Sequence, residues 1–273
     1  MARHVYLDPG DVRAPRRRVQ LVVFWIALLV LFVALWQIAQ AEPMFAPLVF
    51  VGLASLLVAV LVAGAVRVAR STFTLDLRAV DLARLREDVA GAVAKARAML
   101  KQPLAGQQQA MVLSSLGCCA EDEGDFAEAA EIFVRAEGTL RATPMPAVSR
   151  AQWLAVVAAR RAFAHAALGD LQRARATLAT TRLRDAFPTA KTLARRAELV
   201  ISAREGAFDR LASELRASET ALRNSAGWRD RVLVQALTRL CGSKDVLDVE
   251  PHLRAWIVRV VGPSIEPIVR VVS

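Results

Sequence analysis

The chain has 273 residues, of which 55% are hydrophobic, and its 36 Lys and Arg residues against 26 Asp and Glu residues give a formal net charge of +10. This length fits one large domain or a smaller domain with a membrane anchor, and the apolar share exceeds the roughly 45–50% that is usual for soluble domains. The positive charge would suit a nucleic-acid partner. However, Tyr6 is the only tyrosine, and no basic run is interleaved with aromatic residues that could stack on bases. Nucleic acid is therefore disfavoured as a partner.

Two apolar segments near the N-terminus are each long enough to cross a bilayer. Residues 19–39 are interrupted only by Gln20 and Gln37, and residues 44–66 carry no charge. About 20 apolar residues in a helix span the hydrocarbon core of about 30 Å. The connection "QAEP" has one charge and a helix-breaking proline. We therefore predict a transmembrane helical hairpin over residues 19–66, after a basic segment at residues 1–18.

Arginines on both sides of this hairpin predict its orientation. Residues 1–18 and 67–86 hold five arginines each, whereas the connecting loop has neither Lys nor Arg. Positive flanks stay in the cytoplasm, so we expect both termini and the following domain to be cytoplasmic, in a bacterial cytoplasmic membrane. The same arginines suit anionic lipid headgroups. As an alternative, "RAPRRR" and "AQA" around the first span resemble a cleavable signal peptide, although its apolar run exceeds the usual 7–15 residues or so.

The segment at residues 67–106 reads as a juxtamembrane linker helix. Its apolar residues recur at three- and four-residue spacing, which places them on one helical face: Leu82, Leu85, Val89, Ala92, Ala96 and Met99. Pro103 in "KQPLAG" then ends the helix. We expect one continuous helix that leaves the membrane and docks on the domain.

Three similar turns mark the region at residues 107–223. They are "EGDF" at Gly124, "LGDL" at Gly169 and "EGAF" at Gly206. Glycine ends a helix by adopting the left-handed conformation, and an aspartate after it caps the next helix by accepting from exposed N–H groups. Asp125 and Asp170 have this place, and the apolar residues that follow, Phe126, Leu171 and Phe208, are expected to hold each second helix on the first. These turns predict three helix pairs.

The first of these pairs resembles the tetratricopeptide-repeat family. The residues that fall at the usual spacing of that repeat are Leu113, Leu116, Gly117, Ala120, Gly124, Asp125, Phe126, Ala129, Phe133 and Ala136. The spacings between turn glycines, 45 and 37 residues, depart from the family period of about 34 residues. A generic helical solenoid is the alternative. The resemblance implies an all-α solenoid of about three pairs, with small residues at Gly117, Ala120 and Ala129 where two helices cross closely.

Residues 224–273 are predicted to form C-terminal capping helices and a tail. One amphipathic helix is expected over residues 228–240, and Pro251 begins another that "GP" at 262–263 stops. A solenoid needs such helices to cover its last apolar face. No strand alternation is evident, so the predicted fold is all-α throughout.

The stretch "GCCAEDEGD" carries the most conspicuous cluster of reactive residues. Cys118 and Cys119 are adjacent, so their side chains diverge by about 100° on a helix, and neither the three histidines nor Cys241 supplies zinc-ligand spacing. The four acids Glu121, Asp122, Glu123 and Asp125 are expected in a solvated turn. No phosphate-binding loop or catalytic triad pattern is present. We therefore predict no metal, no cofactor and no enzymatic activity.

A binding surface remains as the expected function. In the resembled family, the first helix of each pair lines a concave groove that holds a peptide or an amphipathic helix. Carried onto this chain, the groove residues would be Met111, Ser114, Cys118, Val156, Ala159, Arg160, Phe163, Leu193, Arg196 and Val200. We expect Arg160, Phe163, Arg196 and Val200 to bind a partner with some acidic residues.

Two functional hypotheses follow from this organisation. The first is a membrane-anchored scaffold or adaptor that presents a cytoplasmic tetratricopeptide-like domain to a protein partner. The alternative is an accessory subunit of a larger membrane complex, in which the transmembrane hairpin makes the main contact.

Overall fold

The computed structural model describes residues 26, 30, 46–181, 183, 186–225, 228–242 and 245–272. The basic segment 1–18 and all of the predicted first span except Ile26 and Val30 lie outside these residues. Within the described part of the chain, no helix combines the length and the apolar content needed to cross a bilayer. The predicted second span overlaps the first half of helix α2 (Ala46–Leu85).

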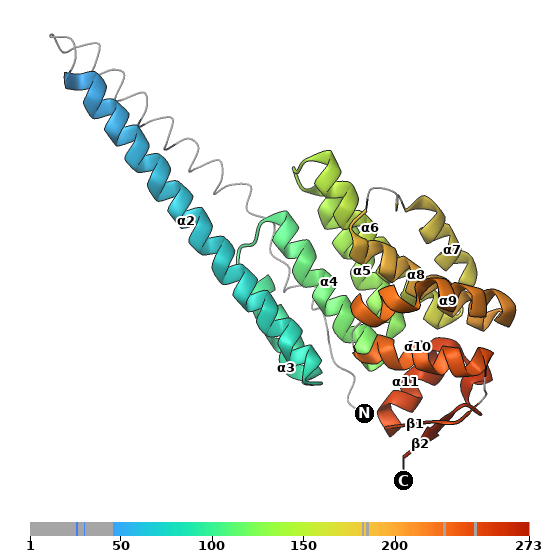
Figure 1. Cartoon of the computed structure of the whole chain (residues 1–273). Helices are drawn as coiled ribbons and strands as arrows, with labels where there is room; N and C mark the ends of the chain where they lie inside the picture. The colour runs from blue at the N-terminus through green and yellow to red at the C-terminus, as the bar shows by residue number, and fades with distance from the viewer. Residues whose placement is uncertain are drawn as a thin grey trace.

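The described chain is mostly helical, as predicted. Helix α2 projects away from the rest of the domain, and α3 (Val89–Leu100) folds back along its last turns (Figure 1). Three antiparallel pairs follow, α4 (Gly106–Glu123) with α5 (Phe126–Ala142), α6 (Ala147–Leu168) with α7 (Leu171–Thr180), and α8 (Pro188–Arg204) with α9 (Phe208–Ser225). Consecutive pairs stack through α5 on α6 and α6 on α8, so the core is continuous along the stack.

The C-terminal region is folded as helices α10 (Trp228–Cys241) and α11 (Pro251–Val261), with the 3-10 turn η1 (Pro263–Ile265). Both predicted capping helices are thereby confirmed. A parallel pair of short strands, β1 (Leu247–Val249) and β2 (Val269–Val271), joins them, with Leu247 opposite Val269. The sequence did not predict this strand pair, although the described chain is mostly helical, as the all-α prediction requires. Three-residue strands are too short to show an alternating pattern in sequence.

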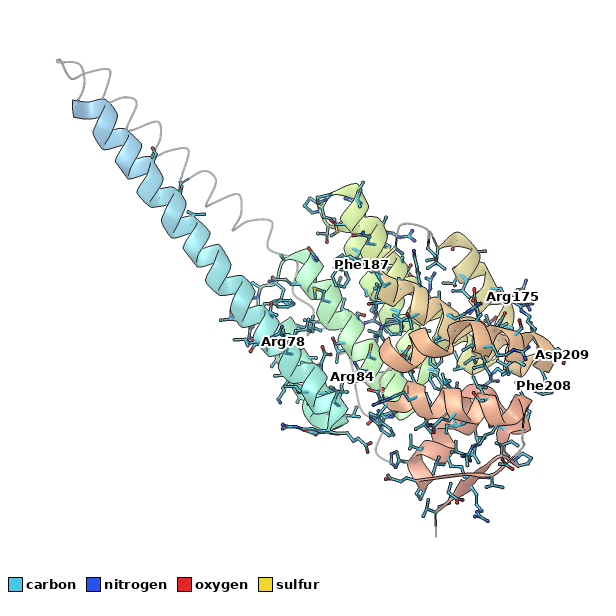
Figure 2. All side chains as sticks on the ribbon, viewed as in Figure 1. Arg78, Arg84, Arg175, Phe187, Phe208 and Asp209 are labelled. Carbon is cyan, nitrogen blue, oxygen red and sulfur yellow. The ribbon has the colours of Figure 1, made fainter. Side chains whose placement is uncertain are left out.

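The turns of the three pairs adopt the predicted geometry. Gly124, Gly169 and Gly206 have φ values of 76°, 84° and 69°, in the left-handed region. Asp125 and Asp170 cap α5 and α7 by accepting from the third N–H beyond them. Phe126 is buried, but Phe208 is 40% exposed at the outer edge of the domain (Figure 2), and Leu211 makes the inward contact instead. Phe126 packs edge-on against Phe163 of the following pair, with ring centroids 6.0 Å apart, whereas Phe208 stays 40% exposed, so its predicted role is wrong.

A fourth turn of the same kind divides the segment that was predicted to be one linker helix. Glu87 has a φ of 64°, and Asp88 caps α3 by accepting from the Gly91 N–H at 2.8 Å. In all four turns, the N–H of the residue after the left-handed position bonds to the carbonyl five residues earlier, at 2.9–3.0 Å. This is the Schellman arrangement. The end of α2 and α3 thus form a helix pair ahead of the three predicted ones, and the single-helix prediction is wrong.

Glu87→Gly should stabilise the protein by about 0.5–1 kcal/mol. A side chain in the left-handed region costs roughly 1–2 kcal/mol, and glycine removes that cost while adding some entropy to the unfolded chain. Thermal unfolding of the full chain in detergent measures this change. Gly206→Glu, which places the same side chain at an equivalent open turn, should destabilise the protein in return. A lower midpoint for Glu87→Gly would contradict this account of the turn.

Candidate functional site

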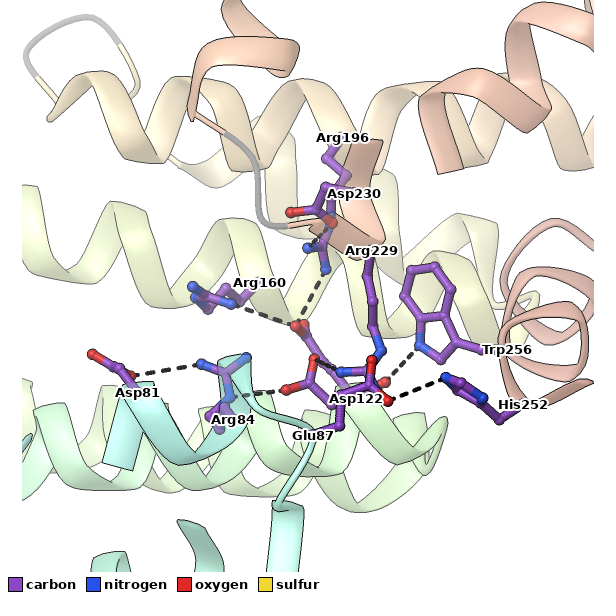
Figure 3. A network of polar contacts seen from close by, with 11 residues as sticks. Asp81, Arg84, Glu87, Asp122, Arg160, Arg196, Arg229, Asp230, His252 and Trp256 are labelled. Carbon is purple, nitrogen blue, oxygen red and sulfur yellow. Dashed lines mark hydrogen bonds and ion pairs between the residues drawn. The ribbon is translucent and has the colours of Figure 1, made fainter. Parts of the chain in front are cut away.

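Six helices meet at a polar pocket in the middle of the domain, which we call the central pocket. Its volume is about 330 Å³. Eight charged side chains line it, four arginines and four acids (Figure 3): Asp81, Arg84, Glu121, Asp122, Arg160, Arg196, Arg229 and Asp230. Trp228, Trp256, Thr189, Thr192, Leu85 and Leu193 complete the wall. The pocket lies between the end of α2 and the stacked helices of the domain, so its side chains connect the two.

Glu121 is the centre of this network. It occupies the last turn of α4, is only 3% exposed, and its Oε2 accepts from Arg196 Nη2 at 3.2 Å and Arg160 Nη1 at 3.4 Å. Arg196 also donates to Asp230 Oδ1 at 2.7 Å, and its guanidinium stacks 3.4 Å from the ring centroid of Phe163. One carboxylate therefore ties α4 to α6 and α8, and Arg196 extends the link to α10.

Asp122 makes a second set of ties on the neighbouring side. Its carboxylate accepts from Arg84 Nε at 2.9 Å and lies 3.3 Å from Arg229 Nη1. Arg84 is also 3.8 Å from Asp81 on the same helix. The backbone carbonyl of Glu121 accepts from the Trp256 indole at 2.7 Å. The end of α2 is thus held to α4 by a charge-assisted bond, and α11 covers the same helix end.

Burial sets the electrostatics of the pocket. It raises the pKa of the Glu121 carboxyl, while Arg196 and Arg160 act in the opposite direction. Burial also raises the pKa of Asp81, which Arg84 opposes. Three buried atoms in the pocket residues have no hydrogen-bond partner, Glu121 Oε1, Arg196 Nε and Arg229 Nε. The four arginines and four acids balance, so these eight side chains bring no net formal charge to the pocket.

The four residues predicted to bind a partner do not form an open groove. Phe163 and Val200 have no exposed surface, and Arg196 is only 7% exposed and paired with two acids. They are inside because α6 and α8 pack face to face, which encloses the side chains between them. Arg160 and Arg196 both line the pocket, and Arg160 is the more accessible, with its side chain 20% exposed and one long contact to Glu121.

The acids were assigned to a solvated turn, and this prediction is wrong for Glu121 and Asp122. Their arginine partners lie 38 to 107 residues away in the chain, at Arg84, Arg160, Arg196 and Arg229. Long-range pairs of this kind leave no local pattern in a chain with arginines on every helix. One signal for burial was available in the sequence. Glu121 lies four residues after Gly117, on the same helical face as Leu113, Leu116 and Gly117.

The adjacent cysteines are packed inside α4. Cys118 and Cys119 are free thiols with 2% and 0% exposure, and burial raises the pKa of both. Among the described residues, no group of three or more His, Cys, Asp or Glu side chains is placed to hold a metal ion. The packing of Cys118 and Cys119 agrees with their interpretation as two small residues within a helix.

Comparison with known proteins identifies no relative of this chain: no family model, curated protein or solved structure matches it. The interpretation of the central pocket therefore depends on the residues and contacts of this chain alone. The resemblance to tetratricopeptide repeats stays a prediction from sequence.

Proposed function

We propose that this protein is a membrane-anchored adaptor whose tetratricopeptide-like domain holds a protein partner at the cytoplasmic face of a bacterial membrane. The observation that carries the proposal is the course of α2. This helix has 40 residues, about 60 Å at about 1.5 Å per residue, and it runs without interruption from the apolar segment to the central pocket. The Arg84–Asp122 bond then fixes its end to the stacked helices.

The partner chemistry follows from what the pocket leaves accessible. Arg160 and Arg229 each have a single long carboxylate contact, at 3.4 and 3.3 Å, and the Arg160 side chain is the more exposed of the two, 20% against 12%. Arg84 and Arg196 each have two acidic partners. Trp228, which is partly exposed, lines the same pocket. An acidic side chain of a partner could therefore pair with Arg160 while an apolar neighbour packs on Trp228. This suits a short amphipathic segment with an acidic residue.

Reporter fusions should place both ends of the chain on the same side of the membrane. A fusion after Arg70 and one at the C-terminus should be active as cytoplasmic reporters, because the arginines flank the hairpin on that side. A fusion at Glu42 should report the opposite side. Alkaline phosphatase and a cytoplasmic fluorescent reporter measure these positions, and a C-terminal fusion active outside the cytoplasm would contradict the orientation.

Arg160→Gln should weaken capture of the partner about tenfold or more, since it removes the accessible guanidinium and a tenfold loss corresponds to about 1.4 kcal/mol. The matched control is Arg173→Gln on α7, whose side chain is 74% exposed and is not among the residues that line the pocket. Affinity capture from detergent extract with the full chain measures both, and circular dichroism checks the fold. Equal capture by the two variants would remove Arg160 from the binding surface.

A further inference from the structure

Helix α2 has two apolar seams after it leaves the apolar segment, and only one of them is covered. Phe73, Leu77, Val80 and Ala83 form the covered seam and pack on the helical domain. Leu75 and Leu82 lie on the opposite side of the helix and are 61% and 51% exposed. Isolated exposed leucines are ordinary on a protein surface. Here they repeat along one helix, opposite a seam that is already buried.

The spacing of the exposed seam is that of a two-stranded coiled coil. Leu75 and Leu82 are seven residues apart, and Leu85 follows three residues later, so they occupy inner heptad positions. Ala79 lies beside them and leaves room for a second helix. Arg78 occupies the remaining inner position. It lies on α2 six residues before Arg84, and both are labelled in Figure 2. A charged residue at an inner position weakens such pairing in isolation.

The charges beside this seam favour one direction of pairing. Asp81 precedes Leu82 on one side of the seam, and Arg86 follows Leu85 on the other, five residues further along. In a parallel pair these flanking positions face each other across the interface, so Asp81 of each copy meets Arg86 of its partner. In an antiparallel pair like positions meet, which places aspartate against aspartate and arginine against arginine. Both residues are exposed, and the Asp81 side chain keeps 52% exposure while it borders the central pocket and lies 3.8 Å from Arg84.

We propose that the exposed seam of α2 pairs in parallel with the same seam of a second copy of this chain, and that the protein is a dimer in the membrane. The inference rests on the proposed anchor in one respect. Two chains inserted in the same membrane present this seam at the same height and in the same direction, which gives a high effective concentration. The confinement of both chains to one membrane thereby offsets the weakening of the helix pairing by Arg78. Because Leu85 and Asp81 also border the central pocket, the two central pockets of the dimer would lie beside its interface.

Cysteine cross-linking of the full chain in native membranes tests the pairing. Cys241 is first replaced by Ala, and Cys118 and Cys119 remain because they are buried. Single substitutions Leu75→Cys and Leu82→Cys are compared with Asp76→Cys, an exposed position about 100° round the same helix. Under mild oxidation, a parallel symmetric pair brings each seam residue next to itself. The two seam variants should give at least about fivefold more disulfide-linked dimer than Asp76→Cys.

A charge exchange tests the direction of pairing in the same assay. Arg86→Glu should lower the cross-linking of Leu82→Cys several-fold by placing two acids face to face, and adding Asp81→Arg should restore it. Dimer yields at Leu75→Cys and Leu82→Cys no higher than at Asp76→Cys would overturn the pairing, as would a linked product containing another protein. Membrane fractionation of the same sample tests the proposed anchor independently of the pairing. Chain recovered outside the membrane fraction contradicts the anchor, while the cross-link pattern still decides the pairing.

Discussion

Replacing Arg196 with Met should destabilise the protein by about 3–5 kcal/mol. The guanidinium is buried between Glu121 and Asp230, and its removal leaves a buried carboxylate system without its main cation. Breaking a buried pair from one side is costly because the remaining charge stays desolvated. Methionine keeps most of the side-chain volume over Phe163, so the loss reports the charge. Thermal unfolding of the full chain in detergent should show a midpoint lower by roughly 10 °C.

Two further variants identify the cause of that loss. Arg173→Met, at a side chain that is 74% exposed, should change stability by less than about 0.5 kcal/mol. Combining Arg196→Met with Glu121→Gln should cost less than the sum of the single changes, since the residues share one network. If Arg196→Met were as mild as Arg173→Met, the central network would not contribute to folding as described.

Gly117→Val should also be strongly destabilising, by about 1–3 kcal/mol or more. A Cβ at this position would lie 2.5 Å from Phe133 Cε1, which is fully buried on α5 and has no room to move. The added side chain would therefore force α4 and α5 apart in the best-packed pair of the domain. Chemical denaturation of the full chain, followed by circular dichroism, measures the change.

Gly138→Ala provides the matched comparison for this prediction. Gly138 lies in the interior of α5, and a Cβ added there meets nothing within 4 Å, so alanine should stabilise the helix by about 0.5–1 kcal/mol. Opposite signs for the two substitutions would separate a packing clash from helix propensity. A neutral Gly117→Val would mean that α4 and α5 do not approach as closely as the structure shows.

The helix pairs could be predicted because their signals are local. Gly124 and Asp125 are adjacent in sequence, and the left-handed turn and the cap need no distant partner. The close crossing at Gly117 was implied by the resemblance to tetratricopeptide repeats, and a Cβ placed there would lie only 2.5 Å from Phe133 Cε1. The turn at Glu87 was missed because a glutamate stands where glycine is usual, although Asp88 after it had the expected capping residue type.

The central pocket could not be predicted because its parts come from distant segments. Whether an arginine on a helix is solvated or buried depends on which acid the fold brings to it. Arg160 and Arg161 are neighbours in sequence, yet the first reaches Glu121 on α4 and the second Glu137 on α5. Two adjacent arginines of similar local context thus have separate buried partners. Which acid each of these arginines contacts is decided by the packing of α6 between α5 and α8, and composition alone does not contain that information.

An anchor exchange tests the central claim most directly. Residues 1–66 of the full chain are replaced by an unrelated two-span hairpin of the same orientation, joined in register to the remainder of α2, and capture from detergent extract is compared with the natural chain. An adaptor should retain the same captured proteins at similar yield, because the docking surface belongs to the helical domain. Loss of those proteins from a correctly inserted and folded chimera would contradict the adaptor and favour an accessory subunit that binds through its hairpin.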